Sequence, residues 1–493
     1  MKHVGRPVPS APWTAPVGIV VVLLAIVFSM VREHLIPFRA TGERRTFLLT
    51  GDEPEYLLAA TSLVRDGDMN LHNNVRDDAW RAFQDRPPIG STRGNLNHFV
   101  AISPRMARVA PERWTDRQLL IHRPGTAVLV APAAWSTRRP RWWAYLIVSS
   151  VLLAGAAILV AQAVRAGASR RPTALVVTML ALSPPGFFYA NPVFPEIPMA
   201  VLLAAGFSML WTRGRTAAVL AAGAAALAPW FSDRVIPAAA CLGVAALLCA
   251  PDRRGRVTVA LLLLAGAAVL AAYYHRRFGV PFPVHHHPRL KASPSFIPEG
   301  LPRVLLDGSR GLIWLFPALV LAPVAFLSWW QSGFARIPCL LLALAAGTSL
   351  LMVASFPDWR GGTCPAGRYG VLVQWLALPA FLAWARAGIS RRQAGLLAIP
   401  LVAGVFQSAW LLRRPNWWYR PYHPLLANSR FARFAEALPW FDLDAPGTAR
   451  LALLWTGVFV AYAVLVWRLR YSATPATTLR VAGGCRGSSA RHP

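Results

Sequence analysis

Lysine is almost absent from this 493-residue chain, in which Lys2 and Lys291 are the two lysines present. Cysteine is also scarce, and its five positions show neither the density of a disulfide framework nor the spacing of a metal site. The sequence has no Walker-type glycine-rich loop and no evident internal repeat. These absences argue against a disulfide-stabilised domain, a cysteine-ligated metal and a nucleotide-binding site.

Acidic residues are few as well. The chain contains 21 Asp and Glu residues and 51 Lys and Arg residues, so its formal net charge is +30. A charge of this size can indicate binding to nucleic acid, whose phosphates attract basic proteins. Most of the arginines, however, flank apolar segments or lie in the loops between them, so we expect no nucleic-acid partner. The use of arginine in place of lysine, with abundant Ala, Gly and Pro, indicates high-GC coding and a bacterial source.

Apolar residues make up 55% of the chain, and its mean hydropathy is +0.41, which is more apolar surface than a water-soluble domain can bury. They come in repeated runs of roughly 17 to 22 residues, the length of a helix that crosses a bilayer. Residues 15–31 follow Lys2 and Arg6 without a small-residue cleavage site, so they predict an uncleaved first span. The pattern predicts an all-α polytopic membrane protein.

Arginines in short loops mark the cytoplasmic side of a membrane protein. Placing the arginine-rich loops on one side gives about twelve transmembrane helices, with both termini in the cytoplasm. This assignment requires residues 119–135, which contain Pro124 and Pro132, to be a juxtamembrane or re-entrant helix instead of a full span. The predicted spans are 14–34, 142–164, 172–190, 197–212, 216–231, 235–250, 257–275, 311–330, 337–356, 371–387, 394–412 and 450–468.

Three long extracytoplasmic loops result from this assignment, at 35–141, 276–310 and 413–449, and the first contains juxtamembrane helices. Nearly every carboxylate falls on the extracytoplasmic side, with Asp252 the clear exception, although arginine alone defines the assignment. We expect residues 1–470 to form one transmembrane domain and residues 471–493 to form a basic, disordered cytoplasmic tail.

The first extracytoplasmic loop holds the adjacent carboxylates of Asp52 and Glu53. A carboxylate near the bilayer surface can act as a general base by accepting the proton of an attacking hydroxyl. A structural alternative exists, because Asp52 can cap a helix that has Pro54 in its first turn, where Glu53 and Glu55 suit the helix dipole. Capping does not exclude catalysis, so both interpretations stay open.

Asp66 and Asp68 flank Gly67 in the same loop and can bind a divalent cation through their carboxylate oxygens. Such a triplet is more often simply a turn. The contiguous histidines 285–287 do not favour zinc, since neighbouring loop residues do not converge easily on one ion. A divalent metal ion is therefore the one cofactor that the sequence leaves open, with Asp66 and Asp68 as its candidate ligands.

Glu196 follows Phe194 and Pro195 at an extracytoplasmic helix junction. An ionisable group at the edge of an apolar span is costly enough to be a functional candidate. Glu196 can orient an acceptor, hold a metal or tune the base. The alternative is an interfacial acid beside proline breaks.

Three arginines at extracytoplasmic junctions are candidates for binding a phosphate, because the planar guanidinium group suits this ligand. Arg234 follows Asp233, while Arg360 and Arg368 lie in a glycine-containing loop that lets the backbone approach a ligand closely. For each arginine taken alone, the alternative is a side chain that extends to the membrane interface.

The order of these features resembles the GT-C superfamily of membrane glycosyltransferases, in particular bacterial relatives of the protein O-mannosyltransferases and aminoarabinose transferases. The resemblance covers most of the chain and rests on Asp52-Glu53, His122-Arg123-Pro124-Gly125, Phe194-Pro195-Glu196 and Gly367-Arg368-Tyr369. It implies a GT-C-like fold in which Asp52 is the catalytic base, Glu53 assists it and Glu196 is the acid of a second loop. The residues that it implies for substrate binding are His122, Arg123, Arg234, Arg368 and Tyr369.

Enzymes of this superfamily take a sugar from a polyprenyl-phosphate carrier and invert the anomeric centre. The resemblance implies such an inverting transferase in the bacterial cytoplasmic membrane, with its active site on the extracytoplasmic side. Its partners are then the lipid-linked donor, membrane lipid and a glycan, lipid or protein acceptor. The main alternative is a lipid or solute transporter or flippase, although carriers usually show repeats and charges near the midplane. A non-catalytic scaffold of the cell envelope is a third alternative.

Overall fold

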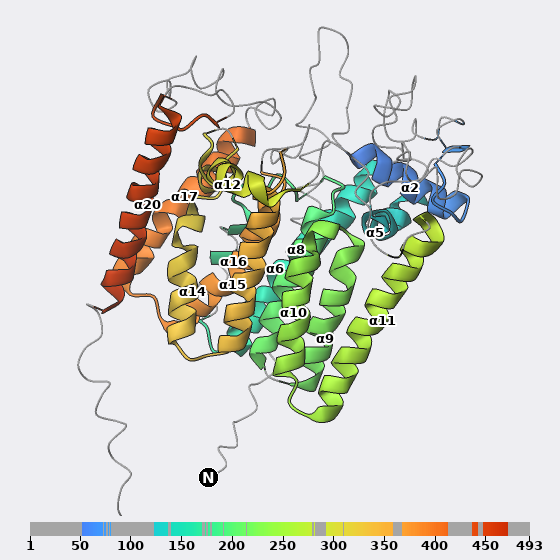
Figure 1. Ribbon diagram of the computed structural model, residues 1–493, viewed down its shortest axis with the longest axis horizontal. Helices are drawn as coiled ribbons and strands as arrows, with labels where there is room; N and C mark the ends of the chain where they lie inside the picture. The colour runs from blue at the N-terminus through green and yellow to red at the C-terminus, as the bar shows by residue number, and fades with distance from the viewer. Residues whose placement is uncertain are drawn as a thin grey trace, which may run out of the picture.

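The computed structural model describes residues 52–71, 123–136, 140–169, 180–190, 192–212, 214–278, 292–308, 310–357, 367–412, 436–441 and 447–471, with a few isolated positions between them (Figure 1). The predicted first span, 14–34, lies outside the described residues, as do much of the extracytoplasmic loops and the tail after residue 471. Within the described ranges the chain is all-helical and has no β-strand, which confirms the predicted α-helical class.

Six of the described helices are long and apolar enough to cross a membrane, as expected of a multi-pass membrane protein. They are α6 (Pro140–Arg165), α11 (Arg253–Phe278), α15 (Arg336–Ala354), α16 (Gly370–Ala387), α17 (Arg391–Leu412) and α20 (Thr448–Tyr471). Each coincides with one of the spans predicted from the sequence, because apolar runs bounded by arginine locate the ends of such helices well.

Shorter apolar helices complete the bundle beside these six. Their sequences are rich in small residues, which lets neighbouring helices approach closely, as where Gly206 of α8 faces the Leu242 side chain of α10. The elements are α8 (Glu196–Met209), η3 (Leu210–Thr212), α9 (Arg215–Leu227), η4 (Ala228–Trp230), η5 (Asp233–Val235) and α10 (Ile236–Cys249).

Two predicted spans differ from the structure. Residues 311–330 do not form one helix but three pieces, α13 (Leu312–Leu315), η8 (Pro317–Leu321) and α14 (Ala322–Gln331). The break lies at Phe316, whose φ of −131° and ψ of 77° are not helical, because a residue before proline is disfavoured in the helical region. The expected span 172–190 is likewise not helical at its end, since residues 182–190 form turns around Pro184, Pro185 and Gly186.

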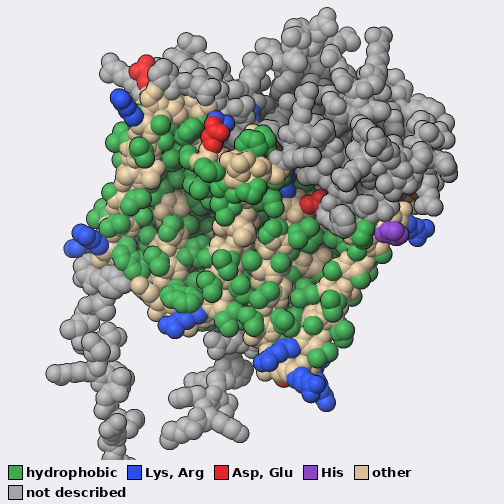
Figure 2. All heavy atoms as spheres, viewed as in Figure 1, with side chains coloured by type: hydrophobic (Ala, Val, Ile, Leu, Met, Phe, Trp, Pro, Cys, Tyr) green, Lys and Arg blue, Asp and Glu red, His purple; other side chains and the backbone are tan. Residues whose placement is uncertain are grey.

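Short helices lie at one end of the bundle, where α2 (Glu53–Arg65), α5 (Pro124–Ala134) and α12 (Ile297–Leu306, preceded by η7, Pro294–Phe296) cross the ends of longer helices (Figure 1). At the opposite end, α9, α11, α15 and α17 each begin at an arginine, and Figure 2 shows basic side chains along that edge. This separation agrees with a topology in which the loops carrying α2, α5 and α12 share one side of the membrane.

Exposed apolar side chains cover the outer helices between these two ends (Figure 2). Leu261 and Leu264 on α11 and Leu453 and Leu454 on α20 are each more than half exposed. Apolar surface costs about 25 cal/mol per Å² in water, whereas lipid acyl chains solvate it. The central helix α16 is instead buried along most of its length, so the segment that leads into it is held by the core of the protein.

Candidate active site

Three carboxyl groups lie in the first turn of α2, and all three are buried. Asp52 is 4% exposed, Glu53 is 0% exposed and Glu55 is 2% exposed. Asp52 occupies the N-cap position of α2, but its side chain makes no capping hydrogen bond. Since buried carboxylates are costly without partners, the partners of this turn must come from other parts of the chain.

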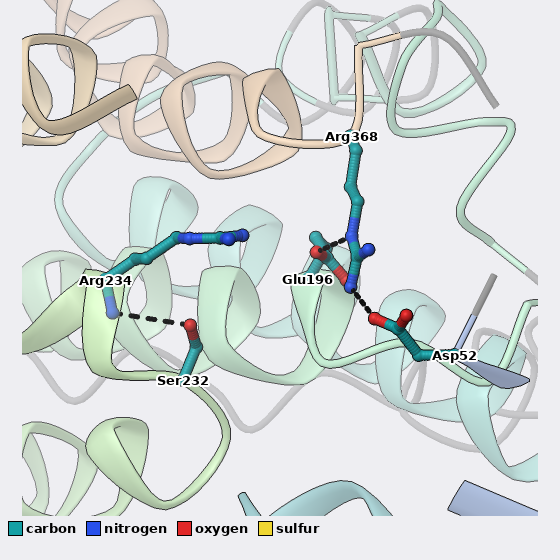
Figure 3. A network of polar contacts seen from close by, with 5 residues as sticks. All are labelled: Asp52, Glu196, Ser232, Arg234 and Arg368. Atoms are coloured by element: carbon teal, nitrogen blue, oxygen red, sulfur yellow. Dashed lines mark hydrogen bonds and ion pairs between the residues drawn. The ribbon is translucent and has the colours of Figure 1, made fainter. Parts of the chain in front are cut away.

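Arg368 joins the two acids that the sequence singled out. Its Nη2 lies 2.6 Å from Asp52 Oδ2, and its Nε lies 2.6 Å from Glu196 Oε1 (Figure 3). These are short, charge-assisted hydrogen bonds, and Arg368 is itself 8% exposed. Asp52, Glu196 and Arg368 therefore come together in one buried cluster, although Asp52 and Arg368 lie 316 residues apart in the sequence.

Glu53 connects the two segments that supply these acids. Its Oε1 accepts a hydrogen bond from the Val193 backbone amide at 3.0 Å, three residues before Glu196 begins α8. Its carboxyl group thus fixes the start of α2 to the turn that precedes α8. This contact links the segments that carry Asp52 and Glu196.

The buried Gln374 side chain of α16 holds the turn that leads toward Glu196. Its Oε1 accepts from the Gly186 amide at 2.7 Å, and its Nε2 donates to the Leu180 carbonyl at 2.7 Å and the Ser183 carbonyl at 3.2 Å. A buried amide with these bonds specifies one arrangement of the chain. The helix that follows Arg368 therefore also fixes part of the path to Glu196.

Gly367 places Arg368 at the entry to α16. Its φ of +77° is in the left-handed region, which residues with a side chain rarely adopt. A Cβ atom at this position would lie 2.7 Å from Leu315 Cδ1 and 2.9 Å from Pro185 Cβ, so the space is also closed. Glycine is required here for both reasons. Its backbone conformation sets the direction in which the Arg368 side chain points.

Arg234 approaches the cluster from η5. Its guanidinium group stacks 4.1 Å from the centre of the Tyr369 ring and 5.3 Å from that of Phe356, and Figure 3 shows the side chain extending toward Arg368 and Glu196. Cation–π contacts of this kind hold an arginine in place without neutralising its charge. Tyr369 also lies 5.9 Å from the Arg368 guanidinium, so both predicted residues belong to this site.

Arg123 lies in a separate ion pair. It precedes α5, pairs with Asp233, and its guanidinium stacks 3.9 Å from the centre of the Tyr274 ring. These contacts fix the short helix α5 to η5 and α11. The other two predicted binding residues, His122 and Arg360, lie outside the described residues.

Asp66 and Asp68 form the turn that ends α2. Asp66 Oδ2 accepts hydrogen bonds from the side chains of Asn73 and Asn74, and Asp68 Oδ1 accepts from the Ser62 hydroxyl. These contacts match the turn interpretation. Across the described part of the chain, no three Asp, Glu, His or Cys side chains converge in a way that could hold a metal ion.

Glu55 and Tyr56 are members of the cluster that the sequence did not single out as functional. Burial, and then the negative charge of Asp52, raise the pKa of Glu55 well above its usual value. The same two causes raise the pKa of Tyr56. Their positions three and four residues after Asp52 could have indicated this, because such side chains lie on the same face of a helix as Asp52.

A small hollow with both polar and apolar lining lies beside Tyr369. Val304, Leu312 and Val353 line it together with Arg310, where α12, α13 and α15 meet the start of α16. The site thus combines buried charge with neighbouring apolar surface.

The chain matches no family model, no curated protein and no solved structure. The function proposed for it therefore rests on the chemistry of this cluster and on its place in a helical membrane protein.

Proposed function

We propose that this protein is a GT-C-like inverting glycosyltransferase that moves a sugar from a polyprenyl-phosphate carrier to an acceptor hydroxyl. The observation that supports this proposal best is the buried contact of Arg368 with both Asp52 and Glu196. Acids from two distant segments are held together beside a second arginine, Arg234, and such constellations of buried charge are typical of functional sites.

In the proposed reaction, Asp52 is the general base. The acceptor oxygen attacks the anomeric carbon from the side opposite the phosphate, and the hydroxyl proton passes to the Asp52 carboxylate. The bond from the anomeric carbon to the phosphate oxygen breaks, and its electron pair leaves with the polyprenyl phosphate. Arg368 orients the Asp52 carboxylate, while Glu196 holds Arg368 from the other side.

Arg234 is the better placed of the two arginines to meet the leaving phosphate. Arg368 already bonds to two carboxylates, whereas the described contacts of the Arg234 guanidinium are with aromatic rings. A positive charge fixed in this way stabilises the charge that develops on the leaving group. The Tyr369 ring assists by holding Arg234.

The arrangement of the helices suits a lipid-linked donor. The cluster lies where α2 begins, at the end opposite the arginine-rich ends, and by the positive-inside rule this supports an extracytoplasmic site. The isoprenoid tail can remain in lipid while its phosphate reaches the cluster. We accordingly place the protein in a bacterial cytoplasmic membrane, with about twelve spans and an extracytoplasmic site.

The proposal is tested by mass spectrometry of envelope glycans, glycolipids and glycoproteins from a strain that lacks the protein. We expect one sugar modification to disappear, to return with the wild-type chain, and to stay absent with Asp52→Asn. Glu299→Gln, which changes an exposed acid on α12, is the matched control and should restore it. Full restoration by Asp52→Asn would contradict the proposed chemistry, and an unchanged glycan profile with altered lipid distribution would favour a transporter.

A further inference from the structure

Glu55 is a buried acid of the candidate site that the proposed sugar transfer does not use. It lies three residues after Asp52 on α2 and is 2% exposed. Its Oε2 atom is buried without a hydrogen-bond partner among the described residues. An ionised carboxylate in such a place is costly, so buried carboxyls of this kind retain their proton.

The surrounding charge also disfavours another anion at this position. Asp52, Glu53 and Glu196 are buried carboxyls of the same cluster, and Arg368 adds one positive charge that it shares between Asp52 and Glu196. Burial and the charge of Asp52 raise the pKa of Glu55, against smaller lowering effects from its own backbone amide and from Arg368. A proton on Glu55 reduces the excess of negative charge.

Several titratable or charged groups surround Glu55. Tyr56 stays neutral at physiological pH, because burial and the charge of Asp52 raise its pKa. Asp52 and Arg368 act on Glu55 itself, while Tyr56, the next residue of α2, interacts with Asp52, Arg368, Glu196 and Glu55.

We propose that Glu55 is a positioning residue of the donor site, which holds a proton while the anionic donor is bound and repels the donor phosphate when it ionises. This inference rests on the proposed function, because it takes the ligand to be a lipid-linked phosphate. The proton exchanges between Glu55 and water, and Glu55 forms no bond to the sugar. Glu55 therefore controls donor affinity without entering the transfer step.

Donor affinity as a function of pH tests this inference. The probe is a polyprenyl methyl phosphate, whose single phosphodiester charge is constant, bound to the purified full-length protein in nanodiscs. As the pH rises and Glu55 ionises, we expect the wild type to lose roughly ten- to thirtyfold in affinity, because the new negative charge repels the phosphate. Glu55→Gln mimics the protonated acid and cannot ionise, so it should keep the low-pH affinity throughout.

The outcomes separate the two proposals. A pH-dependent loss of equal size in the wild type and in Glu55→Gln overturns the role of Glu55 but leaves a lipid-phosphate ligand in place. Absence of binding at every pH contradicts the proposed donor, and the inference fails with it.

Infrared difference spectroscopy provides a measurement that needs no ligand. At neutral pH the wild type should show the carbonyl stretching band of a protonated, buried carboxyl group, and Glu55→Gln should lack the contribution of Glu55 to this band. Glu299→Gln is the control and should retain the band, because the exposed Glu299 pairs with Arg303. A wild type without the band, or a band of undiminished intensity in Glu55→Gln, overturns the inference.

Discussion

At the scale of single residues, Arg368 connects the two halves of the candidate site. It bonds to an acid from the start of α2 and to another from the start of α8. Loss of its charge leaves two buried carboxyls without their shared cation, which is more costly than the loss of a pair at the surface.

We expect Arg368→Ala to lower the free energy of unfolding by about 3 to 5 kcal/mol, the range for breaking a buried pair. Arg303→Ala provides the matched control, because Arg303 pairs with Glu299 one turn away on α12, where Glu299 is exposed. That change should cost less than about 0.5 kcal/mol. Thermal or denaturant unfolding in nanodiscs measures the loss of stability in both variants. Equal losses in Arg368→Ala and Arg303→Ala would contradict a buried structural role for Arg368.

At the scale of elements, the site depends on how α16 begins. Gly367 precedes Arg368 in a left-handed conformation against Leu315 and Pro185, while Gln374, inside the same helix, bonds to the turn at 180–186. The entry to α16 therefore sets the position of Arg368 and part of the path toward Glu196.

Gly367→Ala and Gly388→Ala compare the two ends of α16. Both glycines have positive φ, +77° and +94°, but a Cβ atom at Gly388 would meet nothing within 4 Å. We expect Gly388→Ala to cost about 1 to 3 kcal/mol through backbone conformation alone. Gly367→Ala should cost about 1 to 3 kcal/mol more because of its contacts and should also reduce sugar transfer. Equal unfolding midpoints for Gly367→Ala and Gly388→Ala would show that the contacts of Gly367 with Leu315 and Pro185 do not constrain the start of α16.

Some elements could be predicted from the sequence because their signals are local. Asp52 followed by Pro54 predicted the start of a helix, and α2 does begin at Glu53. The break at Phe316 was missed, because the apolar run continues through it and hydropathy does not register one proline. Local pattern thus located most helices but not the breaks within them.

At the scale of the whole molecule, the helices α9, α11, α15 and α17 begin at arginines at one end of the bundle, and the acids of the candidate site lie at the other end. This division predicts that Glu299 and Arg254, both exposed, face opposite sides of the membrane. In a variant without the native cysteines, a membrane-impermeant maleimide applied to intact spheroplasts should label Glu299→Cys and leave Arg254→Cys unlabelled until the cells are opened. Labelling of Arg254→Cys in intact cells would contradict the topology.

The candidate site was predictable only in part at this scale. Asp52, Glu196 and Arg368 were recognisable one by one, because ionisable groups beside apolar spans are unusual. Their pairing was not, since contacts between residues 172 or 316 positions apart depend on the complete helix packing. Glu55 was missed for the same reason, because its burial follows from packing and not from its neighbours in sequence.

Turnover by the purified protein is the decisive test of the proposal that the Asp52 cluster transfers sugar from a lipid phosphate. Protein in nanodiscs is supplied with polyprenyl-phosphate sugars and an envelope acceptor extract, and the release of free polyprenyl phosphate is measured. We expect release by the wild type and by Glu299→Gln, with Asp52→Asn slower by at least about a hundredfold at unchanged thermal stability. Equal release by Asp52→Asn and the wild type would contradict it.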